Sequence, residues 1–325
     1  IFQEMDRSKK QGKLYIVVPC YNEEEVLPET AKRLKALMNK MISSGEADKL
    51  SRIAFVNDGS TDKTMEIISD LCENDKLFCG INLAKNVGHQ SALLAGLYTA
   101  KDYADAVISM DADLQDDIGA IEKFVYEYKN GYDIVYGVRS SREKDTFFKR
   151  VTAEGFYKFM KFLGADIVFN HADYRLMSKR AVEALMQFSE VNVFLRGIVP
   201  QIGYPSTTVE YERGERFAGT SKYPLKKMIS LAMQGITSFS VKPIRISIVL
   251  SVAAFFVCVL MILYCIVQKL TGTTVSGWAS LGASIWGLGG IQLLMIGVVG
   301  EYIGKIYLET KRRPKFIIER VIYTK

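Results

Sequence analysis

The chain has 325 residues, of which 49% are hydrophobic and 24% charged, with a formal net charge of +6. This composition excludes wholesale disorder, and the length allows one large domain with an appendage. The positive charge is modest and gathers around two apolar stretches, which favours anionic lipid over nucleic acid as the partner. The five cysteines show no metal-binding spacing, so we expect a reduced, cytoplasmic environment without disulfides.

Short β-rich runs alternate with helical patterns over the first 140 residues. Strands are predicted at Leu14–Val18, Ile53–Asn57, Phe78–Leu83, Ala106–Met110 and Asp133–Val138. Helices are predicted near Glu24–Met41, Lys63–Cys72, Gln90–Lys101 and Ile118–Lys129. Strands separated by helices at this spacing predict βαβ units and an α/β fold with a mostly parallel sheet. Ligands bind such sheets beyond the carboxyl ends of the strands, where polar clusters recur in this chain.

The first two clusters are PCYNE at residues 19–23 and NDGS at residues 57–60. Local structure offers an alternative explanation for each of them. Asn22 is a favoured helix N-cap with Glu25 at the capping-box position, and Asp58-Gly59 is a strong turn dipeptide. Taken singly, each cluster therefore supports ligand binding and turn formation about equally.

The next two clusters are KNVGH at residues 85–89 and DADLQ at residues 111–115. Lys85 is placed to meet a diphosphate, whereas the lone His89 is more typical of a polar helix start than of a ligand. Alternate residues of an extended segment point the same way, so Asp111 and Asp113 would present two carboxylates together. Like charges that close raise each other's pKa unless a cation intervenes. The pair therefore favours a hard divalent cation shared with substrate phosphates.

Two long stretches near the C-terminus, Ile246–Val267 and Trp278–Gly300, contain no charged residue. Each exceeds the roughly 20 residues that cross a hydrocarbon core, and buried core helices are the alternative. Lysines and arginines flank the pair, so the positive-inside rule predicts a hairpin with both ends in the cytoplasm. Apolar residues at helical spacing over Leu225–Phe239, beside Lys222, predict an amphipathic helix along the headgroups, or packing on the soluble domain.

In this order and spacing, the four clusters resemble the inverting family-2 glycosyltransferases of GT-A fold. The resemblance is closest to enzymes acting on polyprenyl phosphates, namely dolichol-phosphate mannose synthase and the bacterial bactoprenol-phosphate glucosyltransferases, and the hairpin resembles the bacterial branch. It implies a tail at 1–12, a cytoplasmic GT-A domain at 13–221, a juxtamembrane helix at 222–243, two spans within 244–304 and a basic cytoplasmic tail at 305–325.

The resemblance also implies roles for individual residues. It assigns the nucleotide-sugar site to Pro19, Tyr21, Asn22, Glu23, Asp58, Lys85, Asp111, Ala112 and Asp113, and Mg²⁺ or Mn²⁺ to Asp111, Asp113 and Gln115. It assigns the acceptor phosphate to Arg139, Arg150 and Lys222, the last within a basic loop at Gly214–Tyr223. Asp173, in the segment HADYRL, resembles the active-site Asp and is expected with Arg139 to be catalytic. We assign Asp173 mainly to positioning, with a role as base second, because a phosphate that is already mostly a dianion needs no strong base.

The expected reaction moves a sugar from a UDP-sugar to undecaprenyl phosphate on the cytoplasmic face of a bacterial plasma membrane, for modification of envelope glycans. Glucose ranks first as the sugar, N-acetylglucosamine second, and GDP-mannose is a third donor. The resemblance implies a homo-oligomer, with a tetramer as one candidate. A processive polysaccharide synthase is one alternative, although both tryptophans lie in the second apolar stretch and not in a Gln-x-x-Arg-Trp motif. A catalytically silent, membrane-tethered nucleotide-sugar-binding subunit is the other.

Overall fold

The computed structural model describes residues 12–140, 171–190, 194–212, 214, 242–271 and 277–323. These residues form two compact units, one built around a β-sheet and one made of two long helices, and each is described by itself. The predicted amphipathic helix at 222–243 lies outside the described residues except for its last two positions, which begin the first long helix.

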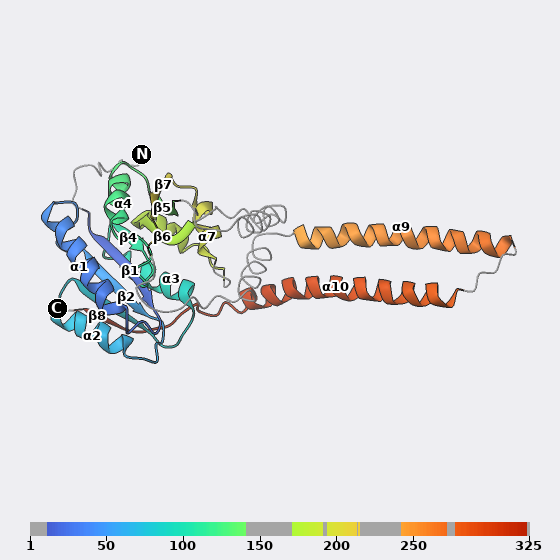
Figure 1. Cartoon of the computed structure of the whole chain (residues 1–325), viewed down its shortest axis with the longest axis horizontal. Coiled ribbons are helices and arrows are strands. Elements are labelled where there is room, and N and C mark those ends of the chain that lie inside the picture. The colour runs from blue at the N-terminus through green and yellow to red at the C-terminus, as the bar shows by residue number, and fades with distance from the viewer. Residues whose placement is uncertain are drawn as a thin grey trace. The chain divides into compact units, whose positions relative to one another are not determined.

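The first unit contains one sheet of eight strands in the order β7-β5-β6-β4-β1-β2-β3-β8 (Figure 1). The four strands β1 to β4 pair in parallel and so do β5 and β7, whereas β6 and β8 run antiparallel to their neighbours. The predicted α/β class with a mostly parallel sheet is confirmed, and the five predicted strands begin within one residue of their predicted starts. The strands are β1 (Leu14–Cys20), β2 (Arg52–Asn57), β3 (Phe78–Leu83), β4 (Ala106–Ser109), β5 (Ile134–Arg139), β6 (His171–Ser178), β7 (Ser206–Tyr211) and β8 (Ile318–Tyr323).

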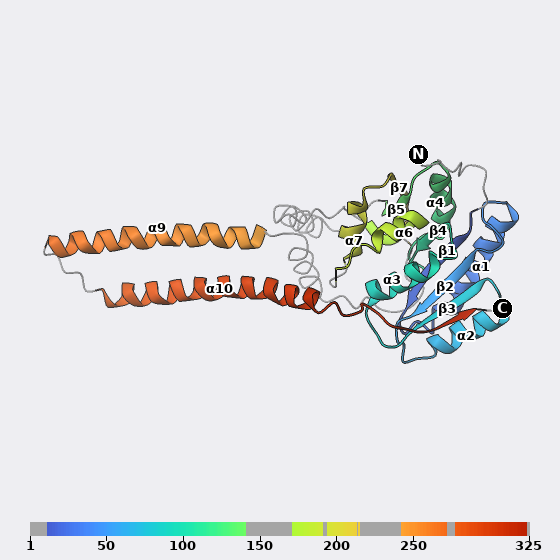
Figure 2. The same ribbon diagram turned by 180° about the vertical axis from the view of Figure 1, so that it is seen from behind.

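Helices cover both faces of this sheet (Figure 2). Successive side chains of a strand point to opposite faces, so a strand of apolar residues packs against helices on both sides. Along β1, Ile16 and Val18 belong to the core shared with α1, α2 and α4. Val17 points the other way, towards α3, where a Cβ at Gly96 would lie 2.3 Å from Val17 Cγ1. The helices are α1 (Leu27–Ser43), α2 (Thr64–Asn74), α3 (His89–Ala100), α4 (Ala120–Lys129), α6 (Lys179–Leu185), α7 (Leu195–Ile198) and the 3₁₀ helix η1 (Val199–Ile202).

The C-terminal segment differs from its prediction. Residues 305–325 were expected to form a basic tail, but the helix before them continues to Thr310 and Ile318–Tyr323 forms β8, which pairs antiparallel with β3. The strand forms despite its charged residues because its apolar side chains find partners in the sheet domain. Tyr323 packs against Tyr103 with ring centroids 5.7 Å apart, and Ile322 packs against the core of the sheet.

The second unit contains α9 (Lys242–Leu270) and α10 (Trp278–Thr310). At about 1.5 Å per residue, both are longer than a hydrocarbon core of about 30 Å. Their most apolar windows, Ile244–Met261 and Gly287–Thr310, have mean hydropathies of 2.5 and 1.4, and none of the side chains described in either window is buried. By length and composition, the two helices that the sequence predicted as spans can cross a membrane.

Candidate active site

The carboxyl edge of the sheet brings together residues that are far apart in the sequence. Asp111 follows β4, whereas Asp173 lies near the start of β6, which runs in the opposite direction. The pairing of Ser109 with Arg175 sets this register, so Asp111 and Asp173 come to the same edge. Ser109 reinforces it, since its hydroxyl donates to the backbone oxygen of Asp173 at 2.5 Å.

The DADLQ segment is a turn and not the extended segment that the sequence predicted. The chain leaves β4 after Ser109, and Leu114 has a φ of 57°, a left-handed conformation that leucine rarely adopts. Asp113 Oδ1 accepts a hydrogen bond from the Gln115 backbone N–H at 3.2 Å. The buried Thr30 hydroxyl of α1 donates to the backbone oxygen of Ala112 at 2.8 Å, which anchors the turn to the core.

Asp111 has the properties of a cation ligand. Its Oδ1 atom is buried and accepts no hydrogen bond. Burial raises the pKa of Asp111 to about 6, and the carboxylates of Asp173, Asp116 and Asp113 add to the rise. A divalent cation fits this place because it would supply the missing partner and offset the repulsion. Over the described ranges, no three or more His, Cys, Asp or Glu side chains are grouped so that they could hold a metal ion.

Two arginines that the sequence analysis did not single out hold Asp173. The Arg175 Nη2 group donates to Asp173 Oδ1 at 2.7 Å, and the Arg196 Nη2 group donates to Oδ2 at 3.2 Å. Burial alone would raise the pKa of Asp173, but Arg196 and Arg175 outweigh it and lower the pKa to about 2. Asp173 is therefore ionised at neutral pH and has little capacity to accept a proton.

His89 lies between the two acids. Its Nε2 atom is 3.4 Å from Asp111 Oδ1 and 3.9 Å from Asp173 Oδ2. It is the first residue of α3, as the helix-start interpretation predicted, and it also belongs to the site, which a lone histidine in a sequence does not reveal. The neighbouring Gln90 accepts a hydrogen bond from the Leu195 backbone N–H at 3.2 Å, which ties the start of α3 to α7.

Arg139, at the end of β5, is held in place by two groups. Its Nε donates to the Tyr211 hydroxyl at 3.3 Å, and its Nη2 lies 3.4 Å from Asp116 Oδ1. The Tyr211 hydroxyl donates to the same Asp116 oxygen at 2.6 Å. Asp116 Oδ2 is buried without a hydrogen-bond partner. The guanidinium is thus fixed at one edge, while the side chain remains 31% exposed.

The first motif is joined to the second by Asn22. Its carboxamide oxygen accepts a hydrogen bond from the Thr61 backbone N–H at 2.8 Å, and its own backbone is left-handed, with a φ of 54°. Helix α1 begins only at Leu27, so the N-cap role considered for Asn22 is wrong. The side chain instead fixes the loop after β2 against the loop after β1.

The second motif is joined to the third by Asp58, which is buried. Its carboxylate oxygens accept hydrogen bonds from the backbone N–H groups of Val87 at 2.7 Å and Gly88 at 3.0 Å. Burial raises the pKa of Asp58, and these two N–H groups partly oppose that rise. Asp58 therefore shapes the loop that leads to His89.

Gly59 marks the closest approach of these loops. Its φ is 63°, and a Cβ there would lie 2.5 Å from the Asn86 backbone nitrogen. We expect Gly59→Ala to lower the free energy of unfolding by about 2 kcal/mol or more, because backbone strain and a clash add together. Urea denaturation measures this loss. Gly203→Ala is the matched control, since Gly203 has a φ of 73° but no atom within 4 Å of its Cβ, and equal losses would contradict the contact explanation.

The other residues predicted for the site differ in burial and in their contacts. Pro19 is buried within β1, Tyr21 is 47% exposed after it, and the Glu23 backbone N–H donates to the Thr64 hydroxyl. Lys85 is exposed in the third motif. The Gln115 backbone oxygen accepts a hydrogen bond from the Gly214 N–H at 2.9 Å. Arg150, Lys222 and all but the first residue of the predicted basic loop lie outside the described residues.

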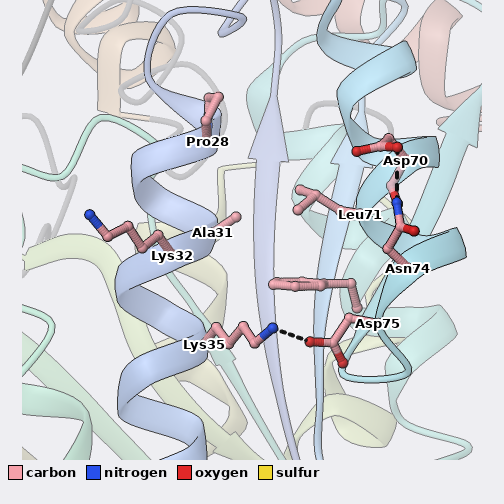
Figure 3. A pocket seen from close by; sticks show the side chains of 9 residues that line it. Pro28, Ala31, Lys32, Lys35, Asp70, Leu71, Asn74 and Asp75 are labelled. Atoms are coloured by element: carbon pink, nitrogen blue, oxygen red, sulfur yellow. Dashed lines mark hydrogen bonds and ion pairs between the residues drawn. The ribbon is translucent and has the colours of Figure 1, made fainter.

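A cavity of about 280 Å³ between α1 and α2 is separate from this cluster (Figure 3). Two polar contacts join residues that line it: Lys35 Nζ lies 2.7 Å from Asp75 Oδ2, and the Asn74 carboxamide donates to Asp70. None of the acids or arginines described above lines it. The candidate active site therefore lies at the carboxyl edge of the sheet and not in this cavity.

Comparison with known proteins identifies the family. The family model for glycosyl transferase family 2 matches residues 15–186, and that for the GtrB C-terminal hairpin matches residues 242–306. The first match covers more than half of the chain, so the protein belongs to glycosyl transferase family 2. The resemblance to family-2 glycosyltransferases that carry a two-helix hairpin is confirmed, and the apolar hairpin makes this member membrane-associated.

Similar proteins align over nearly the whole chain. The uncharacterized glycosyltransferase YkoT of Bacillus subtilis is 53% identical, covering 97% of this chain and 94% of its own length. The prophage bactoprenol glucosyl transferase homolog of Escherichia coli is 42% identical, covering 95% of this chain and 99% of its own. The SfII prophage-derived bactoprenol glucosyl transferase of Shigella flexneri is 41% identical over 95% of this chain and 98% of its own.

Proposed function

We propose that the protein transfers glucose from UDP-glucose to undecaprenyl phosphate at the cytoplasmic face of a bacterial plasma membrane, with inversion at the anomeric carbon. One observation carries the proposal: Asp111, whose buried Oδ1 atom has no hydrogen-bond partner, lies beside an ionised Asp173 in a family-2 chain that carries an apolar hairpin. The names of the Escherichia coli and Shigella relatives support both glucose and the lipid acceptor.

The donor would bind across the loops after β1 to β4. Tyr21, Asn22, Glu23 and Asp58 are proposed for the nucleoside, with Pro19 beneath them, and Lys85 and Ala112 for the diphosphate and sugar. Asp111 and Asp113 would hold Mg²⁺ or Mn²⁺ with Gln115 close by. When bound, the cation would act as a Lewis acid that neutralises charge on the departing nucleoside diphosphate.

In the proposed reaction, an oxygen of the acceptor phosphate forms a bond to the anomeric carbon, and the bond from that carbon to the UDP oxygen breaks. The bonding pair leaves with UDP. The attacking phosphate is mostly a dianion at neutral pH, because its second pKa is about 6, and it has no proton to give up. Asp173, with a pKa of about 2, therefore serves to position the reactants rather than to act as a base.

The acceptor phosphate would meet Arg139, with Arg150 and Lys222 as further proposed contacts. A guanidinium binds phosphate oxygens in pairs, which suits a single, well-oriented anion. The orientation of Arg139 depends on Tyr211 and Asp116, so these two are proposed as positioning residues.

A labelled-sugar assay tests this function. The full chain is incubated with undecaprenyl phosphate and labelled UDP-glucose, UDP-N-acetylglucosamine or GDP-mannose, with Mg²⁺ or with EDTA. We expect label in the lipid fraction from UDP-glucose, and its loss with EDTA. Label in a long water-soluble polymer would favour the processive synthase. Nucleotide binding without transfer from any donor would favour the silent subunit.

Removal of the Tyr211 hydroxyl tests the positioning of Arg139. We expect Tyr211→Phe to raise the KM for undecaprenyl phosphate about 10-fold, equal to about 1.4 kcal/mol, because the Arg139 guanidinium loses one of its two anchors. The Kd for UDP should change little. Steady-state kinetics and calorimetry measure the two quantities. Tyr126→Phe, on the exposed face of α4, is the control, and a weaker UDP affinity in Tyr211→Phe would contradict the assignment.

A further inference from the structure

The two arginines that hold Asp173 differ in exposure. Arg175 is 3% exposed, and its side chain is enclosed by the protein. Arg196 is 42% exposed, although it donates to the other oxygen of the same carboxylate at 3.2 Å. One arginine of the pair is therefore an internal counter-ion, and the other faces out of the protein.

Asp173 and the two arginines that hold it, Arg175 and Arg196, together carry a net positive charge. Asp173 carries one negative charge, and Arg175 alone neutralises it through the shorter hydrogen bond, 2.7 Å against 3.2 Å. A guanidinium has five N–H donors, and in the described part of the chain Arg196 uses one of them. Its Nε is also buried without a hydrogen-bond partner. Arg196 thus has a positive charge and donors beyond what Asp173 requires.

The positive charge of Arg196 lies within the candidate active site. It lies on α7, whose first residue, Leu195, is bonded to Gln90 beside His89. Arg196 interacts electrostatically with the Asp111 carboxylate, which attracts it, and with the Arg139 guanidinium, which repels it, so it belongs to the same cluster as both. The Asp173 carboxylate raises the pKa of the Arg196 guanidinium above its ordinary value. Arg196 therefore stays charged at any pH at which the protein is folded.

We propose that Arg196 binds a phosphate group of the reactants with the donors that Asp173 leaves unused. The ligand chemistry is a phosphate anion, and its two sources are the donor diphosphate and the acceptor monophosphate. The proposal rests on the proposed function and adds a residue to it. Asp173 would then orient Arg196, as Asp116 orients Arg139, so that the site presents two guanidiniums that carboxylates hold in position.

Binding measurements on the purified full chain test this proposal without requiring turnover. One arm measures the Kd for UDP by calorimetry in the presence of Mn²⁺. The other measures retention of radiolabelled undecaprenyl phosphate by the detergent-solubilised chain. The variants are Arg196→Gln and Arg196→Lys, and Arg180→Gln is the matched control, because Arg180 is 51% exposed and pairs with Asp133 outside the site.

We expect Arg196→Gln to weaken one of the two affinities at least about 10-fold, and Arg196→Lys to weaken it less, since the charge remains. The arm that changes identifies the source of the phosphate. Arg180→Gln should change neither. If both affinities stay within about 2-fold of the wild type in both variants, Arg196 is only a counter-ion of Asp173 and the proposal is wrong. Failure of the proposed function would look different, since the wild type itself would then not transfer sugar to the lipid.

Discussion

Asp111→Asn is expected to lower kcat for sugar transfer by about 1,000-fold or more, equal to about 4 kcal/mol. The change is nearly isosteric and keeps the turn after β4, but it removes the charge from the carboxylate whose Oδ1 has no hydrogen-bond partner. The proposed cation would then be held more weakly, and less of the charge on the departing nucleoside diphosphate would be neutralised. Kinetics with saturating Mn²⁺ measure the loss, and electron paramagnetic resonance of Mn²⁺ in the presence of UDP measures the accompanying loss of binding.

The control for this variant is Asp102→Asn. Asp102 is 61% exposed and pairs with Lys101 on the surface, so the same change of charge should leave kcat unaltered. The thermal stability of the cation-free protein provides a second readout. It should rise in Asp111→Asn, because a partly buried carboxylate with three acidic neighbours is replaced by a neutral amide. Activity within about 10-fold of the wild type would refute the assignment of Asp111 to the cation.

Asp173→Asn is expected to reduce both transfer and stability. Arg175 would be left buried without its counter-ion, and breaking a buried pair by removing one partner costs about 3–5 kcal/mol. Urea denaturation measures this loss. Asp75→Asn removes the partner of Lys35, which is 48% exposed, and should cost about 1 kcal/mol or less. Similar losses at the two positions would contradict the buried clamp.

The contribution of Asp173 to stability should depend on pH in a defined direction. Its pKa is about 2 in the folded protein, below the value of about 3.9 in an unfolded chain, so the unfolded chain binds more protons between these values. The stabilisation is therefore present above about pH 4 and is lost as the pH falls towards 2. The difference in unfolding free energy between the wild type and Asp173→Asn should shrink over that range. A difference that stays constant would contradict the lowered pKa.

Much of the fold could be predicted from the sequence because its signals are local. Each of β1 to β4 is a short apolar run followed by a helical pattern, β5 is a further apolar run, and all five begin within one residue of the expected start. The strand β6 could not be found this way, since Asp173 and Arg175 interrupt its apolar residues and pair with each other only after folding. The strand β8 carries charged residues and forms only because β3 offers it an edge.

As with the fold, part of the candidate site could be predicted from the sequence and part could not. The acids after β4 follow a strand directly, so their position could be deduced from chain order alone. Arg196 and His89 could not be assigned, because their roles depend on distances to Asp173 that the sequence does not contain. The extended geometry expected for Asp111 and Asp113 is wrong for a related reason: the turn at Leu114 is held by Thr30, from a helix about 80 residues earlier.

The pairing of β8 with β3 has a consequence for how the protein is made. Asn82 on β3 and Glu319 on β8 are hydrogen-bonded at a separation of 237 residues, and both long apolar helices lie between them. Domains fold from the N-terminus during synthesis, so β3 spends that interval as an open edge of a nearly complete sheet. An open apolar edge is a template for pairing with other chains. A nascent chain that stalls before β8 emerges therefore exposes an aggregation-prone edge, and the sheet is capped only once the hairpin has been synthesised.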